Sequence, residues 1–119
     1  MAKRRLRTTA LERVFRKRTL MDYYEAGREL ETLVATEGGG RPTRLIKDLT
    51  GKLDARERIL WAILRFYRTF TEKTVAEAEA MGAEWSEVRR FMEEPGKREV
   101  GDLTALRRRV EERRNRARG

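Results

Sequence analysis

The sequence predicts an all-α fold, a compact helical bundle with basic helices at both ends. Only Pro42 and Pro95 interrupt the 119 residues, and no stretch alternates apolar and polar side chains for long enough to form a strand. Apolar residues recur instead at helical spacing, as at Leu103, Leu106 and Val110. A chain of this length forms one domain with a modest core.

The first part of the chain predicts helices that end at a run of glycines. A helix over residues 10–18 can be capped by Thr8 or Thr9. It either continues or kinks near Thr19 and then runs on through an apolar stripe. The segment EGGGRP stops it, because glycine favours the backbone conformation that ends a helix.

The middle of the chain has helix-turn-helix proportions over residues 43–70. A short helix from Thr43 is followed by a turn, TGKL (50–53), and then by a longer helix that starts at Asp54. Glu57, three residues on, completes a start that resembles a capping box.

In a helix-turn-helix the second helix presents its N-terminal side chains to the major groove. Those side chains would be Arg56 and Arg58, and we expect them to influence sequence preference. Asp54 and Glu57 count against this arrangement because they repel phosphate at the point of approach. Helix pairs with short turns are also common in proteins that do not bind DNA.

The segment RILWAILRFYRTF (58–70) predicts a central core helix, because its apolar arc is wide. Its aromatic side chains are expected in the core before any base-stacking platform. Trp61 lies on the polar side, between Arg58 and Arg65, where no core requirement explains it. It is either half-buried under a neighbouring helix with its N–H toward solvent, or it contacts a partner protein or a nucleic-acid backbone.

The last third predicts three helices. Gly82 ends the first, and the next, over 83–94, ends at Pro95. The final helix begins at residue 102 or 103. Its apolar stripe fades beyond Val110, so we expect it to dock by its first two turns and to project its basic remainder.

Charge divides the chain into a basic arm (1–20), a helical core domain (21–96) and a basic C-terminal helix or tail (97–119). The net charge is +9, with eight basic and one acidic residue in the first part, twelve and fifteen in the second, and nine and four in the third. Basic termini on a mildly acidic body suit a polyanion, although such ends can also serve only solubility. A membrane surface is not expected, because neither end pairs its basic face with a broad apolar one.

These patterns define the residues expected to contact nucleic acid, with partner contact by Trp61. They are Arg4, Arg5, Arg7, Arg16, Lys17 and Arg18 in the arm; Arg41, Arg44, Lys47, Lys52, Arg56, Arg58 and Arg65 around the 43–70 unit; and Arg107, Arg108, Arg109, Arg113 and Arg114 in the last helix.

Catalysis is not expected. The chain has no cysteine and no histidine, which removes thiolate nucleophiles, imidazole chemistry and the usual zinc ligand sets. Adjacent acids such as Glu93 and Glu94 point in different directions on a helix, so no metal site or cofactor is predicted. A cytoplasmic protein is expected, because no apolar run could cross a bilayer and no signal peptide is present. The scarcity of Asn and Gln fits a heat-adapted source, although the arginine bias could equally come from a GC-rich genome.

Four segments resemble, in order and rough spacing, the N-terminal domain of the YhcG family of bacterial proteins. They are YYEAGREL, GGGRPTRLIKDLTGKL, LRFYRTF and EWSEVRRFM, which together span roughly residues 22–94. The matching positions are Tyr24, Glu25, Gly27, Arg28, Gly40, Leu45, Ile46, Leu49, Arg65, Phe66, Tyr67, Phe70, Trp85 and Ser86.

The resemblance implies a helical, winged-helix-like DNA-binding module, which in that family is joined to a C-terminal PD-(D/E)xK nuclease. The chain departs from the family in having Glu87 where histidine usually follows Trp-Ser, and KLDARER in place of a Gly-Phe-Ser turn. It also ends before a nuclease domain could begin. The resemblance therefore implies binding without cleavage.

The expected function is a small non-catalytic protein that binds nucleic acid, with double-stranded DNA favoured. Two alternatives stay open. One is a helical subunit of a larger ribonucleoprotein, such as the small subunits of CRISPR effector complexes, with RNA or single-stranded DNA as its ligand. The other is a protein-interaction or assembly module, which would form a homo-oligomer or bind a separately encoded partner.

Overall fold

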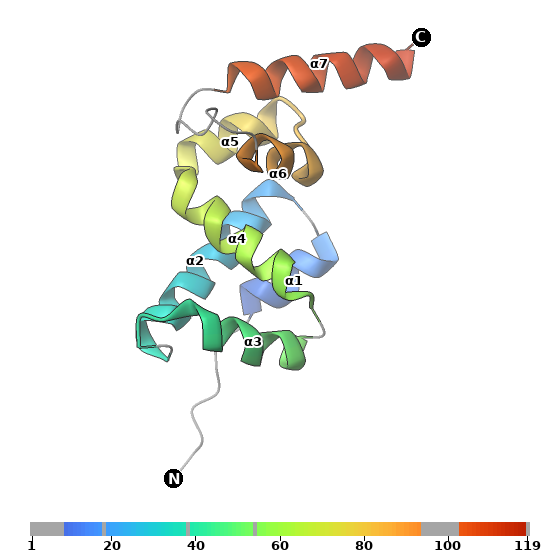
Figure 1. Ribbon diagram of the computed structural model, residues 1–119. Helices are drawn as coiled ribbons and strands as arrows, with labels where there is room; N and C mark the ends of the chain where they lie inside the picture. Colours follow the sequence, from blue (N-terminus) through green and yellow to red (C-terminus); the bar gives the residue numbers. More distant parts are fainter. Residues whose placement is uncertain (1–8, 18, 38, 54, 94–102, 119) are drawn as a thin grey trace.

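The computed structural model describes residues 9–17, 19–37, 39–53, 55–93 and 103–118, without the side chains of residues 16, 17, 104, 105 and 118 (Figure 1). All regular structure in this part of the chain is helical, which confirms the predicted all-α fold. The helices are α1 (Thr9–Lys17), α2 (Leu20–Thr36), α3 (Pro42–Leu53), α4 (Glu57–Thr69), α5 (Glu72–Ala80), α6 (Trp85–Glu93) and α7 (Thr104–Arg118). None of these helices is long and apolar enough to cross a bilayer.

The helix is interrupted between α1 and α2, near the kink predicted at Thr19. Thr19 has an extended backbone, and its hydroxyl accepts a hydrogen bond from the N–H of Asp22 at 3.1 Å. A threonine at this position satisfies one of the N–H groups that a helix start leaves without a partner. It thereby fixes the first residue of α2.

The start of α1 is capped from another helix. Thr9 lies inside α1, so the prediction that it is the cap is wrong, and Thr8 falls outside the described residues. The N–H groups of Ala10 and Leu11 instead donate to Glu29 Oε2 in α2, at 2.6 and 3.0 Å. A carboxylate is well suited to this place, because the helix dipole is positive there.

Glycines end α2 as predicted. Gly39 and Gly40 have φ angles of 61° and 82°, a region that side chains other than glycine rarely adopt. The N–H of Gly40 donates to the carbonyl of Val34 at 2.9 Å, which satisfies one of the last carbonyl groups of α2.

The helix α3 is longer than predicted. Residues 50–53, expected as a turn, continue the helix to Leu53. Helical geometry places Leu53 on the same side as the buried Ile46 and Leu49, where it packs against the core. Gly51 lies within α3 and does not have a positive φ angle, so it does not end the helix. The connection to α4 is therefore only residues 54–56.

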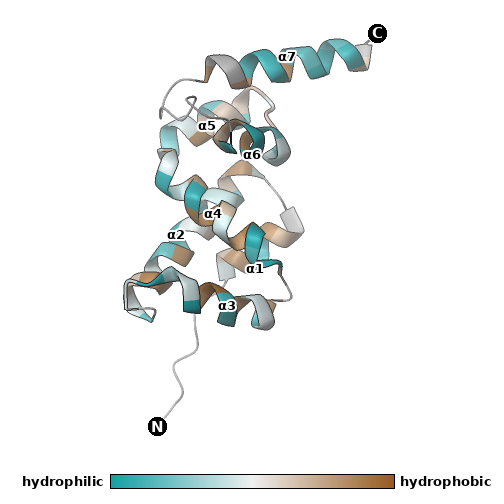
Figure 2. Ribbon diagram, viewed as in Figure 1, coloured by the Kyte–Doolittle hydropathy of each residue, from teal (hydrophilic) through white to brown (hydrophobic). Residues whose placement is uncertain are grey.

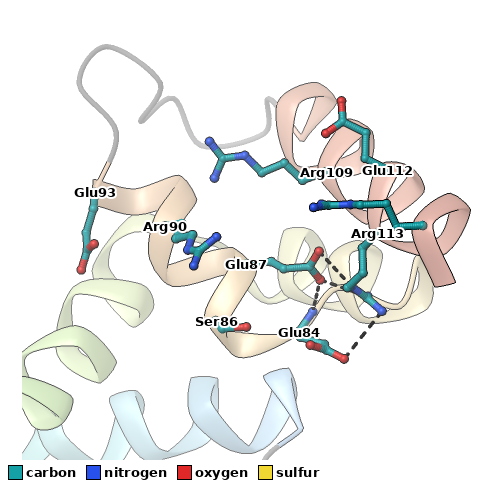
Figure 3. A pocket seen from close by; sticks show the side chains of 9 residues that line it. Glu84, Ser86, Glu87, Arg90, Glu93, Arg109, Glu112 and Arg113 are labelled. Carbon is teal, nitrogen blue, oxygen red and sulfur yellow. Dashed lines mark hydrogen bonds and ion pairs between the residues drawn. The ribbon is translucent and has the colours of Figure 1, made fainter.

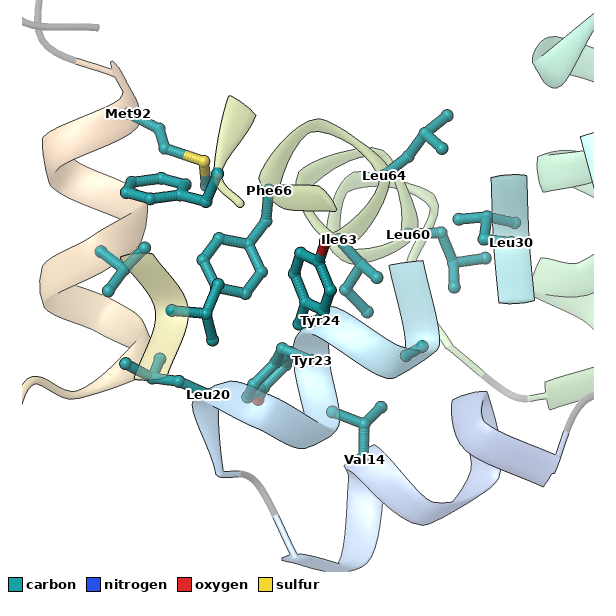
Figure 4. Close-up of a cluster of buried hydrophobic side chains, with 14 of the residues drawn as sticks. Val14, Leu20, Tyr23, Tyr24, Leu30, Leu60, Ile63, Leu64, Phe66 and Met92 are labelled. Carbon is teal, nitrogen blue, oxygen red and sulfur yellow. The ribbon is translucent and has the colours of Figure 1, made fainter. Parts of the chain in front are cut away.

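The helix α4 begins at Glu57, so the start predicted at Asp54 is wrong. Arg56 is the N-cap and makes no side-chain capping bond, and Asp54 itself lies outside the described residues. The central position predicted for this helix is confirmed, because α4 packs against α2, α3 and α6. Its buried side chains are Leu60, Ile63, Leu64 and Phe66 (Figure 4).

A close approach of two backbones joins α2 to α4 at Gly27. A Cβ atom at this position would lie 2.5 Å from Tyr67 Cβ and 2.9 Å from the carbonyl oxygen of Ile63. Only a glycine lets the two backbones come this near. Tyr24, one turn before it, packs edge-on against Phe66 with ring centroids 6.4 Å apart.

A stacked aromatic pair holds α6 against the bundle. The rings of Trp85 and Tyr23 lie 4.0 Å apart at an interplanar angle of 7°, and Phe66 meets Trp85 edge-on at 5.2 Å. Gly82, with a φ of 83°, ends the preceding helix α5 as predicted. The turn between α5 and α6 is therefore held in place, and α7 packs on it.

The last helix, α7, packs beside this turn. Leu106 and Val110 in the helix and Leu103 just before it are all buried, as predicted. It lies at one end of the molecule, and α3 lies at the other (Figure 1). Most of its length is hydrophilic (Figure 2).

Candidate nucleic-acid interface

The outer face of α3 is basic because the helix is amphipathic. Leu45, Ile46 and Leu49 are buried, and helical spacing places Arg44 and Lys47 on the opposite side. Both are exposed. Arg41 before the helix, Lys52 in its last turn and Arg56 after it are also exposed, and Asp48 is the one described acidic residue in this stretch.

None of these five basic side chains has an ion-pair or hydrogen-bond partner within the described part of the chain. We name the set the α3 surface: Arg41, Arg44, Lys47, Lys52 and Arg56. The α3 surface spans both ends of a helix about 18 Å long. It can present several cationic groups to one ligand without first breaking an internal contact.

Other arginines are used differently. Arg68 donates two hydrogen bonds to Glu31, at 2.6 and 2.9 Å, and these bonds raise the pKa of Arg68 and lower that of Glu31. Arg13 pairs with Glu25 at 3.1 Å. These arginines tie helices together, so they cannot serve as ligand contacts without a loss of packing.

The residues predicted to read bases or phosphates along α4 have three different environments. Arg56 is exposed at the N-cap. The side chain of Arg58 is 79% exposed and lies 3.9 Å from Glu93 Oε1, which is a weak pairing. Arg65 is half-buried and donates to the carbonyl of Met92 at 3.1 Å.

The second helix of the 43–70 unit is enclosed by its neighbours. Because α2, α3 and α6 all pack on α4, only its first turn offers exposed basic side chains beside the α3 surface. The α3 surface can therefore reach phosphates as it stands, whereas α4 is too enclosed to enter a groove of DNA.

Two arginines predicted to project from α7 are docked instead, and the prediction that the helix is anchored only by its first two turns is wrong. Arg113 donates to Glu87 at 3.0 and 3.1 Å (Figure 3). It also donates to the carbonyl of Gly82 at 2.8 Å. Arg114 donates to the carbonyl of Met81 at 2.7 Å. The apolar stripe fades beyond Val110, but polar contacts continue the interface.

The pairing of Glu87 with Arg113 perturbs both groups. Burial of Glu87 acts to raise the pKa of its carboxyl, but the hydrogen bonds from Arg113 and from the N–H of Glu84 outweigh it, so the pKa is lowered. The hydrogen bond to Glu87 raises the pKa of Arg113. Both shifts favour the ion pair that holds α7 on α6.

The rest of α7 is more accessible. Arg107 and Arg108 are exposed and have no ion-pair partner among the described residues. Arg109 lines a groove of about 680 Å³ between α6 and α7, facing Arg90 across it (Figure 3). Since the same groove also contains Glu84, Glu87, Glu93 and Glu112, its charges largely cancel.

Trp61 lines a second groove, of about 330 Å³, between α4 and α6. It is half-buried, as one interpretation predicted, but its N–H faces Glu57 Oε1 at 3.4 Å and not only solvent. Sequence patterns did not single out Arg89, which lines the same groove. Helical spacing was the signal that could have found it, because Arg89 lies one turn after Trp85 at the edge of the apolar face, whereas Arg90 lies opposite that face.

The nucleic-acid contacts predicted in the N-terminal arm lie outside the described residues or side chains. Arg4, Arg5, Arg7 and Arg18 fall outside the described residues, and the side chains of Arg16 and Lys17 do too. Over the described ranges, no three acidic side chains gather closely enough to hold a metal ion.

Comparison with protein-family models, with curated proteins and with solved structures yields no match for this chain.

Proposed function

We propose that this protein binds the phosphate backbone of a nucleic acid, with the α3 surface as the principal contact. The observation that carries this proposal is the division of the basic side chains. Those that join helices have acidic or carbonyl partners, whereas those of the α3 surface are exposed and have none among the described residues.

The charge of this stretch suits a polyanion. Residues 41–56 contain five basic side chains against Asp48 and Asp54, so the net charge is +3. Phosphates follow one another at about 3.4 Å along the axis of a DNA strand, and a helix of about 18 Å therefore faces roughly five of them. Several simultaneous phosphate contacts give affinity through counterion release.

A second contact can come from Arg107 and Arg108 on α7. Because α3 and α7 lie at opposite ends of the molecule (Figure 1), one ligand that reaches both must run along its length. Contacts of this kind position the protein on the backbone and carry little sequence information. We therefore expect weak sequence preference, with any preference arising from Arg56 and Arg58.

The test is fluorescence-anisotropy binding of the full chain to duplex DNA, single-stranded DNA and RNA over a salt series. The variant Arg44→Met/Lys47→Met is expected to weaken binding and to reduce the slope of log K against log salt by roughly two, about one for each lost phosphate contact. Lys73→Met on α5 is the matched control, because Lys73 is exposed and distant from α3.

Two outcomes would overturn the proposal. One is no binding of any nucleic acid at roughly 0.15 M salt. The other is a salt slope of the double variant equal to that of the wild type and of the Lys73→Met control.

A further inference from the structure

The groove beside Trp61 combines an aromatic side chain with three arginines. It lies between α4 and α6 and is lined by Arg58, Trp61, Ala62, Arg65, Arg89, Met92 and Glu93. Its volume of about 330 Å³ is at the lower end for small-ligand sites, which hold about 300–1,000 Å³.

Trp61 contributes to the core and to the groove. Its side chain packs against the core, and it is half-buried along one wall of the groove. Its N–H donates to Glu57 Oε1 at 3.4 Å, a long bond that orients the ring from one edge, and the same side chain lines the groove.

The arginines around the ring are incompletely satisfied. Arg65 uses one terminal nitrogen on the carbonyl of Met92, and Arg58 is only loosely paired with Glu93 at 3.9 Å. The Nε atom of Arg89 is buried and has no hydrogen-bond partner. A buried N–H without an acceptor costs stability, so Arg89, which also lines the groove, is held there without a compensating internal bond at this atom.

We propose that this groove holds an unpaired base of a nucleic-acid strand, stacked on Trp61, with the adjacent phosphate bound by Arg58 and Arg89. This rests on the proposed function and names single-stranded nucleic acid as the ligand of this site. Stacking on an aromatic ring beside arginines is the usual means of binding unpaired bases.

The location agrees with the α3 surface. Arg58 borders the groove and is two residues from Arg56, which belongs to the α3 surface. A strand whose phosphates lie along α3 can therefore continue past the first turn of α4 and place a base against Trp61. A base-paired strand cannot do this, because its bases stay stacked within the duplex.

Tryptophan fluorescence tests the stacking directly. The chain has two tryptophans, and Trp85→Phe leaves Trp61 as the only tryptophan while keeping an aromatic ring on Tyr23. Titration with an oligothymidine is expected to quench Trp61. An abasic oligonucleotide and a duplex of the same length are expected to bind by anisotropy without quenching. Equal quenching by all three, or none by oligothymidine when anisotropy shows that it binds, would overturn the inference.

Two variants separate this site from a structural role, and they also serve if Trp85→Phe does not fold. Trp61→Leu is expected to weaken oligothymidine binding by roughly 5- to 100-fold and to leave duplex binding unchanged. Arg89→Met is expected to weaken oligothymidine binding while thermal stability stays equal or rises, because the buried N–H is removed. Arg90→Met, on the neighbouring face of α6, is the matched control and should change neither.

Failure of the inference differs from failure of the proposed function. If Trp61→Leu and Arg89→Met bind oligothymidine like the wild type while Arg44→Met/Lys47→Met loses affinity, the groove is not a base site and the phosphate contact stands. If the full chain binds no nucleic acid, both proposals fail.

Discussion

Replacement of Gly27 by alanine tests the close contact between α2 and α4. The added Cβ would lie 2.5 Å from Tyr67 Cβ and 2.9 Å from the carbonyl oxygen of Ile63, whereas ordinary contacts begin at 3.4 Å. The shortfall is therefore about 1 Å against a Cβ atom and about 0.5 Å against a backbone oxygen. Neither atom is the end of a flexible side chain, so α2 and α4 must separate.

The expected magnitude follows from two opposing terms. Overpacking of a core costs about 1–3 kcal/mol, and a clash with backbone belongs at the upper end. Alanine is a better helix former than glycine by about 1 kcal/mol, which offsets part of this. We expect a net loss of about 1–2 kcal/mol, or a fall in Tm of roughly 5–10 °C.

Gly51→Ala is the matched control for this prediction. Gly51 lies in α3, and a Cβ there would meet nothing within 4 Å. Only the gain in helix propensity remains, so stability should rise by about 0.5–1 kcal/mol. Thermal unfolding followed by circular dichroism measures both variants. A Gly27→Ala protein as stable as Gly51→Ala would refute the reasoning.

Three further predictions concern helix ends and the α6–α7 pair. Glu29→Ala removes the acceptor at the start of α1, so we expect a loss of about 1–2 kcal/mol and faster amide hydrogen exchange in α1. Thr19→Ala removes the cap of α2 and should cost about 1 kcal/mol in urea unfolding. Glu87 has a lowered pKa, so its contribution is complete above its unfolded pKa of about 4.5 and is lost as the pH falls through the folded value. Glu87→Gln should therefore be less stable at neutral pH and should lose less stability on acidification, as measured by urea unfolding over a pH series.

Each of these has its own contrary result. Unchanged exchange in α1 would show that Glu29 is not its cap, and an unaltered urea midpoint would exclude the proposed role of Thr19. A Glu87→Gln protein whose stability falls with acid as steeply as that of the wild type would remove the pairing with Arg113 as the cause.

Local signals determined many of the helix boundaries. The glycines at 39, 40 and 82 end helices because their backbones adopt positive φ angles, and Thr19 begins one because its hydroxyl reaches a nearby N–H. These effects act within a few residues, so the sequence displays them. Where a signal was weak, as in TGKL, packing of Leu53 extended the helix through the predicted turn.

The sequence by itself determined that the chain is helical, that the 58–70 segment is central and that both ends are basic. Only the tertiary structure decided which arginines are available to a ligand. Arg68 finds Glu31, 37 residues away in the chain, and Arg113 finds Glu87, 26 residues away, whereas Lys47 finds no partner among the described residues. Helical periodicity reports the face on which a side chain lies, but the partner opposite that face depends on how distant helices pack.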